Sequence, residues 1–248
     1  WRARTEGAAH LAPALVAATA ALGLGSLLGP YSTMLFAHVT TALGVAGLLW
    51  CLIGAEPSRR RLLGAGAFAS LAVSADYSAA VLVLGLVLAL RWGRWRDLVW
   101  VAAGAAPVAA LTAGYHWVAF GGPFRIGYDY QTNFEFARDR STTFSGNPLS
   151  GLWHLLGWGR SGGGLLVLCP VWLLGVWGLM RRPGGWALLT ACGVYGLMLA
   201  THQTPWGGAG EDHRYLIACL PVLMVGLCGL LADPPIQPAV LWPLAGVA

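Results

Sequence analysis

Six long apolar runs constrain the fold of this chain more than any other feature of its sequence. They are Leu11–Gly29, Tyr31–Ala55, Leu98–Phe120, Gly163–Met180, Gly185–His202 and Tyr215–Ala232. A helix needs about 20 mostly apolar residues to cross a bilayer, because its backbone polar groups must pair within the segment itself. Only 10% of the residues are charged, against about 25% in soluble domains. The sequence therefore predicts an all-α integral membrane protein.

A shorter pair of apolar runs, within Leu62–Leu90, is interrupted by Asp76 and Tyr77. Each run has about 14 residues, and a helix of that length rises only about 21 Å, less than the roughly 30 Å of the hydrocarbon core. We expect a hairpin of two short helices, or a re-entrant pair, with Asp76 at its tip. With the six long runs this makes about eight membrane segments, forming a single polytopic bundle over residues 1–248.

The distribution of arginines predicts the orientation of this bundle. All 15 basic residues are arginines, and ten of them flank the predicted segments at alternate ends. These ten are Arg2, Arg4, Arg59, Arg60, Arg61, Arg91, Arg94, Arg96, Arg181 and Arg182. Positive charge collects on the cytoplasmic side of membrane proteins, so the hairpin tip and the polar loops face the other side. Arginines that sit between apolar runs, rather than along one face, also argue against a nucleic-acid partner.

The largest polar stretch, residues 121–162, is predicted to be an extracytoplasmic loop that contains one short helix. Asn147 can cap this helix, and Pro148 suits its first turn. Its apolar residues recur at a spacing of three to four and form one face; they are Leu149, Leu152, Trp153 and Leu156. Such a helix either lies flat on the membrane surface or packs against the top of the bundle.

Three groups of polar residues on the outer side supply candidate site residues. Asp76 is an ionisable group at membrane depth, which indicates function by default, although a solvated turn is the alternative. In the stretch 121–130, Arg125 can hold a phosphate, and Tyr128 and Asp129 can contact a sugar or headgroup, although an Arg–Asp pair in a structural loop explains them equally well. The third group comprises Trp206, Glu211, Asp212, His213, Arg214 and Tyr215. Its acidic and His residues are adjacent in sequence and do not converge on one ion, so no metal site is predicted.

His38 and the cysteines have simpler interpretations. His38 lies two helical turns from the outer end of its segment, where it either faces a cavity or is a satisfied core histidine. The five cysteines lie in apolar runs without a CxxC pair, which favours small-residue packing over metal or disulfide chemistry.

Five stretches, in this order, resemble the C-terminal half of bacterial GT-C-type membrane glycosyltransferases, the group that includes protein O-mannosyltransferase-like and aminoarabinose-transferase-like enzymes. They are Pro30–His38, Ala72–Tyr77, Phe120–Tyr128, Arg160–Pro170 and Trp206–Pro221. Two details differ from the usual family pattern. His213 stands where the family has Pro before Arg-Tyr, and Leu-Val-Leu-Cys precedes Pro170 where aromatics and Ser are usual.

The resemblance implies a multi-pass transferase of the bacterial inner membrane that moves a sugar from a polyprenyl-phosphate donor to a cell-envelope acceptor on the extracytoplasmic side. Such enzymes place a catalytic acid in a first outer loop, which here would precede Trp1, so we expect a fragment that is inactive alone. We expect catalytic roles for Asp76 and Arg214, with Arg214 on the lipid phosphate. Substrate binding is expected from Arg125, Tyr128, Asp129, Trp206, Glu211, Asp212, His213 and Tyr215. A divalent cation is allowed but not demanded. The partners are the lipid-linked sugar and membrane lipid.

Two other classes of membrane protein stay open on the sequence alone. A secondary transporter also has broken helices and polar groups near the midplane, but here the polar residues gather at one face and no internal repeat is visible. A non-catalytic lipid-handling protein of the cell envelope is the second alternative.

Overall fold

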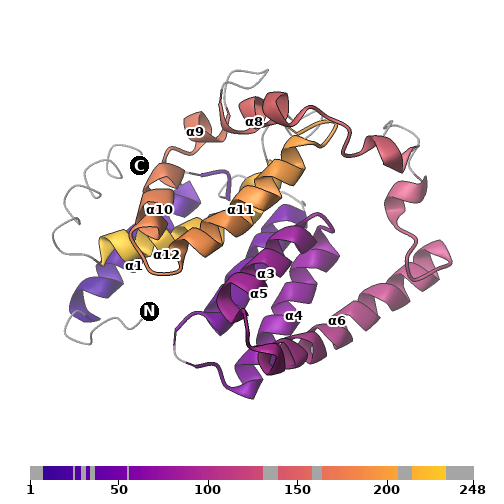
Figure 1. Cartoon of the computed structure of the whole chain (residues 1–248), viewed down its shortest axis with the longest axis horizontal. Coiled ribbons are helices and arrows are strands. Elements are labelled where there is room, and N and C mark those ends of the chain that lie inside the picture. Colours follow the sequence, from indigo (N-terminus) through magenta and orange to yellow (C-terminus); the bar gives the residue numbers. More distant parts are fainter. Residues whose placement is uncertain are drawn as a thin grey trace.

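The computed structural model of the chain describes residues 8–24, 26–28, 32–33, 37–54, 56–130, 139–157, 164–205 and 214–232. Regular structure in these ranges is helical throughout (Figure 1), which confirms the predicted all-α class. The helices are α1 (Ala8–Leu24), α3 (Ala37–Leu52), α4 (Arg59–Ala75), α5 (Ala79–Arg91), α6 (Trp95–Phe120), α8 (Pro148–Leu156), α9 (Leu165–Leu168), α10 (Val171–Met180), α11 (Gly185–Ala200) and α12 (Leu220–Leu231). Three 3₁₀ turns are η2 (Gly127–Tyr130), η3 (Arg140–Thr142) and η5 (Arg214–Cys219).

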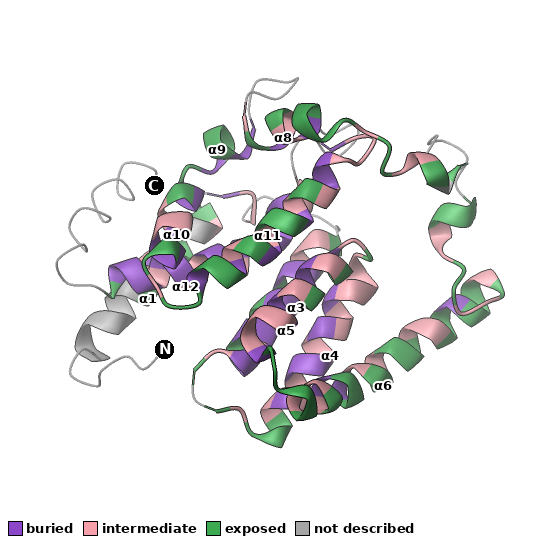
Figure 2. Ribbon diagram, viewed as in Figure 1, coloured by how far each residue is buried: buried purple, intermediate pink, exposed green. Residues whose placement is uncertain are grey.

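Two helices in the described ranges are long and apolar enough to cross a membrane. They are α6 and the continuous stretch of η5 and α12, Arg214–Leu231, while α3, α5, α10 and α11 are shorter apolar helices. Most of α6 is exposed (Figure 2), and its exposed side chains include Leu111, Trp117 and Val118. An exposed apolar surface of this kind is typical of a membrane-facing helix. The number of about eight segments stays a prediction.

The predicted hairpin is confirmed, with one boundary moved. Helix α4 ends at Ala75, and Asp76 takes an extended conformation before α5 begins at Ala79. The first helix of the hairpin is longer than expected because it starts at Arg59, where the Ser58 side chain accepts a hydrogen bond from a backbone N–H of the first turn. A serine in this position satisfies one of the free N–H groups at a helix start.

The predicted span Gly163–Met180 is not one helix in its described part, which begins at residue 164. A four-residue helix, α9, ends at Leu168, and α10 begins only after Pro170. Proline lacks the N–H that a continuous helix requires and its ring clashes with the preceding turn. The ten-residue α10 is too short to cross a bilayer alone.

Glycines allow two pairs of helices to pack in direct backbone contact. A Cβ added at Gly104 of α6 would lie 2.0 Å from the carbonyl oxygen of Leu63 in α4. A Cβ at Gly178 of α10 would lie 2.0 Å from the carbonyl oxygen of Gly226 in α12. Close packing through small residues is typical of helices in membranes.

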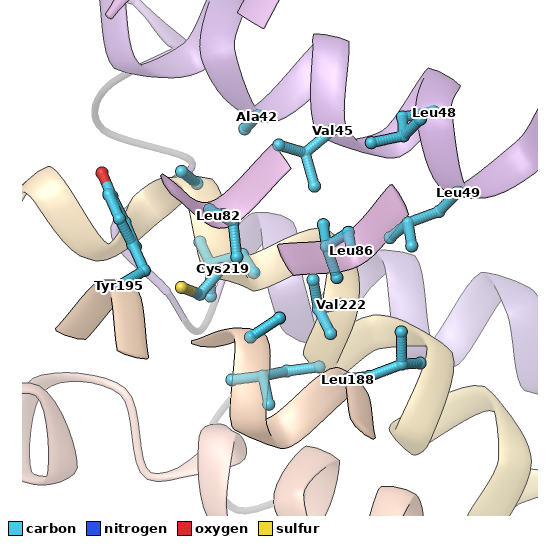
Figure 3. Close-up of a cluster of buried hydrophobic side chains, with 14 of the residues drawn as sticks. Ala42, Val45, Leu48, Leu49, Leu82, Leu86, Leu188, Tyr195, Cys219 and Val222 are labelled. Atoms are coloured by element: carbon cyan, nitrogen blue, oxygen red, sulfur yellow. The ribbon is translucent and has the colours of Figure 1, made fainter. Parts of the chain in front are cut away.

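The core lies where α3, α5, α11 and the start of α12 meet (Figure 3). Leu48, Leu82, Leu188 and Val222 from these four helices are fully or almost fully buried. Tyr195 of α11 is also fully buried and lies beside this cluster in Figure 3. The core thus sets α5 and α11 side by side, with Tyr195 toward the end of α11 that lies near the start of α5.

Arginines gather at one end of the bundle, around the last turn of α3. The guanidinium of Arg61 donates to the carbonyls of Trp50 and Ile53, and buried Arg91 donates to the carbonyl of Leu52. A helix end has unpaired carbonyls and the negative end of the helix dipole, so arginines stabilise it. These are among the arginines that the sequence assigns to the cytoplasmic side.

Candidate functional site

A cavity of about 410 Å³ opens at the other end of the bundle from these arginines. It is bounded by the α4–α5 turn, the loop after α6, the end of α11 and the start of η5. Its lining residues are Asp76, Tyr77, Ser78, Val81, Ile126, Tyr128, Thr143, Phe144, Met198, Leu199, His202 and Tyr215. The cavity thus combines apolar walls with a few convergent polar groups, which is typical of a ligand site.

Asp76 is the acidic group of this cavity. Its Oδ1 accepts hydrogen bonds from the backbone N–H of Ser78 at 2.9 Å and from the Ser78 hydroxyl at 2.7 Å. This is the Asx turn that Asp forms with the residue two positions on. Its Oδ2 lies 3.5 Å from Nδ1 of His38. The Asp76 side chain is only 15% exposed.

The hydrogen bonds keep Asp76 charged despite its burial. Burial acts to raise the pKa of Asp76, but hydrogen bonds from His38 and Ser78 outweigh it and lower the pKa below its ordinary value. Asp76 lies in the turn between α4 and α5 and is therefore a carboxylate at neutral pH. A buried carboxylate that faces a cavity is suited to hold the hydroxyls of a polar ligand.

Two hydroxyl groups connect this carboxylate to the neighbouring elements α11 and η5. The Ser78 hydroxyl lies 3.2 Å from the Tyr195 hydroxyl, which also donates to the backbone carbonyl of Tyr215 at 3.1 Å. These contacts join α5, α11 and η5 at one point. The position of Tyr215 in the cavity wall is therefore tied to that of Asp76.

Tyr215 also carries the aromatic contacts of the site. Its ring meets His38 edge-on at 5.4 Å between centroids and lies 5.7 Å from the ring of His202. The guanidinium of Arg214 lies 5.8 Å from the centre of the Tyr215 ring. A cation at this distance from an aromatic face is attracted to it, so Arg214 is held beside the cavity wall.

His202 follows the last turn of α11 and presents one ring nitrogen as a donor. Its Nδ1 accepts from the backbone N–H of Thr204 at 3.0 Å, so the neutral ring carries its proton on Nε2. Burial lowers the pKa of His202, with the charge of Asp76 acting in the opposite direction. His202 is therefore a neutral donor near neutral pH.

The loop after α6 contributes Tyr128. Burial is the main cause that raises the pKa of Tyr128; Asp76 adds to the increase and Arg214 opposes it. The charges of Asp76 and Arg214 therefore act on the same phenol. Asp129 instead accepts from the backbone N–H of Ile126 at 3.0 Å and closes its own turn. The exposed side chain of Arg125 lies over Gly122 and does not line the cavity.

The structure thus brings some predicted site residues together and separates others. Asp76, Tyr128 and Tyr215 line one cavity and Arg214 adjoins it, whereas Arg125 and Asp129 belong to the nearby loop. Trp206, Glu211, Asp212 and His213 lie outside the described residues. Sequence reasoning did not single out Ser78, Tyr195 or His202. The Asp-x-Ser spacing could have indicated the first.

The short helix of the loop is α8, and its predicted cap is confirmed. The Asn147 side chain accepts from the N–H groups of Leu149 and Ser150. Gly151 packs directly against the backbone of Ala200 in α11, while Leu149 and Trp153 stay exposed. The helix therefore packs on the bundle with one side and presents apolar residues on the other.

Within the described ranges, no group of three His, Cys, Asp or Glu side chains is placed to hold a metal ion. Scans against protein-family models, curated proteins and solved structures each found no match to this chain. The resemblance to GT-C-type glycosyltransferases therefore stays a prediction from the sequence.

Proposed function

We propose that this chain belongs to a multi-pass glycosyltransferase of the bacterial inner membrane, which moves a sugar from a polyprenyl-phosphate donor to a cell-envelope acceptor on the extracytoplasmic side. In this proposal the bundle has about eight membrane segments. The arginine-rich end faces the cytoplasm, and the cavity around Asp76 opens on the opposite side.

The position of an apolar groove beside the polar cavity carries this proposal. A second hollow of about 450 Å³ lies between α5 and α11, and Val81 lines both it and the cavity. Its walls continue through Gly85 and Ala191 to Trp92, toward the arginine end. A polar site next to an apolar groove fits an amphiphile with a small polar head and a long hydrocarbon chain.

The polar groups of the cavity suit the head of such a donor. The guanidinium of Arg214 lies 5.8 Å from the centre of the Tyr215 ring and would stabilise the phosphate as it departs with negative charge. Asp76 and the Nε2–H of His202 would hold sugar hydroxyls, and the rings of Tyr128 and Tyr215 would pack against the sugar face. Holding donor and acceptor in register in this way lowers the barrier to transfer.

Donor turnover in membranes tests the proposal. Membranes from cells that express the intact protein would be incubated with polyprenyl-phosphate-linked mannose or aminoarabinose, and release of polyprenyl phosphate would be measured by mass spectrometry. Release above that of membranes without the protein supports the proposal. Binding of the donor without release would instead favour the lipid-handling alternative. Absence of both binding and release would contradict the assignment.

A further inference from the structure

His116 of α6 forms hydrogen bonds with both of its ring nitrogens, although only 6% of its surface is exposed. Its Nδ1 lies 3.2 Å from the carbonyl oxygen of Pro123, and its Nε2 lies 2.9 Å from the hydroxyl of Tyr77. A carbonyl oxygen can only accept, so Nδ1 carries the proton. In the neutral ring Nε2 must then accept from Tyr77. The two contacts together define one tautomer.

Aromatic rings surround His116. The rings of Tyr77, Tyr115 and Phe120 lie 6.0, 5.8 and 5.8 Å from it, centroid to centroid. The carbonyl of Pro123 accepts from Nδ1 in either charge state. His116 is therefore arranged to accept a proton through Nε2.

Tyr77 connects this histidine to the cavity. It follows Asp76 in the chain and lines the same cavity, while its hydroxyl reaches His116. A hydroxyl bonded to an imidazole that a third group orients is the arrangement that activates hydroxyl groups in many enzymes. Here the third group is the carbonyl of Pro123.

We propose that Tyr77 and His116 form a proton relay that removes the proton of the acceptor hydroxyl during transfer; this inference rests on the glycosyltransferase function proposed above. The acceptor oxygen forms a bond to the anomeric carbon of the sugar, and the bond from that carbon to the phosphate oxygen breaks, with its electron pair leaving on the phosphate. The acceptor proton passes to the Tyr77 oxygen while the Tyr77 proton passes to Nε2 of His116. The imidazolium later returns a proton through Tyr77 to water.

This relay places proton acceptance on the turn between α4 and α5 and on α6. Burial raises the pKa of Tyr77, so the phenol stays protonated at neutral pH and the two transfers occur together. The titratable groups that face the pair are Asp76, next to Tyr77 in the chain, Tyr115 of α6 and Tyr128 of the loop.

The kinetic test compares two variants that each remove the hydroxyl of a tyrosine whose ring lies next to His116. Tyr77→Phe should lower the turnover of the polyprenyl-phosphate-sugar donors by about 100-fold or more, the usual contribution of general base catalysis. Tyr115→Phe, which lies outside the relay, should keep near wild-type turnover. His116→Gln should lower turnover and also abolish the loss of rate at acid pH that a titrating imidazole causes. A purely structural role for His116 would leave that pH profile unchanged.

Nitrogen NMR of the protein with labelled histidine provides the second measurement, which needs no activity. The relay requires the His116 proton on Nδ1 and a change in this signal in Tyr77→Phe. A proton on Nε2, or full turnover in Tyr77→Phe, would overturn the relay while leaving the proposed function intact. If the wild-type protein releases no polyprenyl phosphate, the proposed function fails first and the relay has no role in transfer.

Discussion

Asp76 and Tyr215, which lie far apart in the sequence, are joined through two hydroxyl groups. Ser78 donates to the Asp76 carboxylate at 2.7 Å and contacts Tyr195, and Tyr195 donates to the Tyr215 carbonyl. The same two residues are also joined through His38, which contacts the carboxylate and meets the Tyr215 ring. Because both routes cross between helices, the shape of the cavity depends on how α3, α5 and α11 pack.

Replacing Asp76 by Asn should weaken donor binding or turnover by roughly 10- to 100-fold, because hydrogen bonds to a charged group contribute about 1.5–3 kcal/mol. The chain provides a matched control in Asp139, whose Oδ1 accepts from Ser141 N–H at 2.9 Å and from the Ser141 hydroxyl at 2.7 Å. Asp139 is exposed and does not line the cavity. Asp139→Asn should therefore leave binding unchanged, and equal losses in the two variants would argue against a role for Asp76 in the site.

The acid stability of the protein should depend on Ser78. Hydrogen bonding lowers the pKa of Asp76 below its ordinary value of 3.8, so the charged carboxylate stabilises the fold above that pH. This contribution is lost as the pH falls through the folded-state pKa. At neutral pH, Ser78→Ala should lower the free energy of unfolding by about 1 kcal/mol and the unfolding temperature by roughly 2–4 °C. Well below pH 3.8 the stability of the variant should converge with that of the wild type. Ser141→Ala should change little, and a difference that persists into strong acid would contradict this explanation.

Any side chain at position Gly104 should disrupt the packing of α4 against α6. A Cβ there would meet the Leu63 carbonyl at 2.0 Å, whereas a Cβ at Gly114 of the same helix has nothing within 4 Å. Gly104→Ala should destabilise the protein by about 1–3 kcal/mol through overpacking, and Gly114→Ala should be neutral or stabilising because Ala favours helix more than Gly does. Thermal unfolding in detergent measures both, and equal stability of the two variants would show that the helices separate at little cost.

Arg214 should be needed for turnover more than for folding. Arg214→Ala removes the charge that would stabilise the departing phosphate, and the loss of one such group costs about 100- to 1000-fold in rate. Arg214→Lys keeps the charge without the planar fork of donors and should recover part of the activity. Size-exclusion chromatography in detergent checks that both variants fold. Unchanged polyprenyl phosphate release in Arg214→Ala would remove this residue from the site.

The sequence predicted those features that depend on local chemistry. The break at Asp76 and the cap at Asn147 follow from residue types that interrupt or begin a helix, and both are present. The break after Leu168 was missed because Pro is tolerated within many membrane helices, so Pro170 did not by itself indicate an end. Local sequence signals therefore predicted the positions of most helices, but placed some of the helix ends incorrectly.

The parts of the site that depend on helix packing could not be predicted in the same way. Tyr195 and His116 lie in helices that are apolar on all sides, so no hydrophobic face indicates which residues point inward. Asp76, Tyr128 and Tyr215 were identified because they lie in or next to polar segments. The contacts that join them, through Ser78, Tyr195 and His38, arise only when the helices are assembled.

Filling the groove between α5 and α11 should block the lipid part of the donor without changing the polar cavity. Val194 lines the groove and is 53% exposed, so Val194→Trp should occupy that space at little cost to the fold. Leu197, on the same helix and 48% exposed, lines neither the groove nor the cavity, and Leu197→Trp is the control. We expect Val194→Trp to weaken binding of a long-chain polyprenyl-phosphate sugar while leaving a short-chain analogue unaffected, because only the long chain reaches the groove. Equal binding of the long-chain donor to both variants would place the hydrocarbon chain elsewhere on the protein.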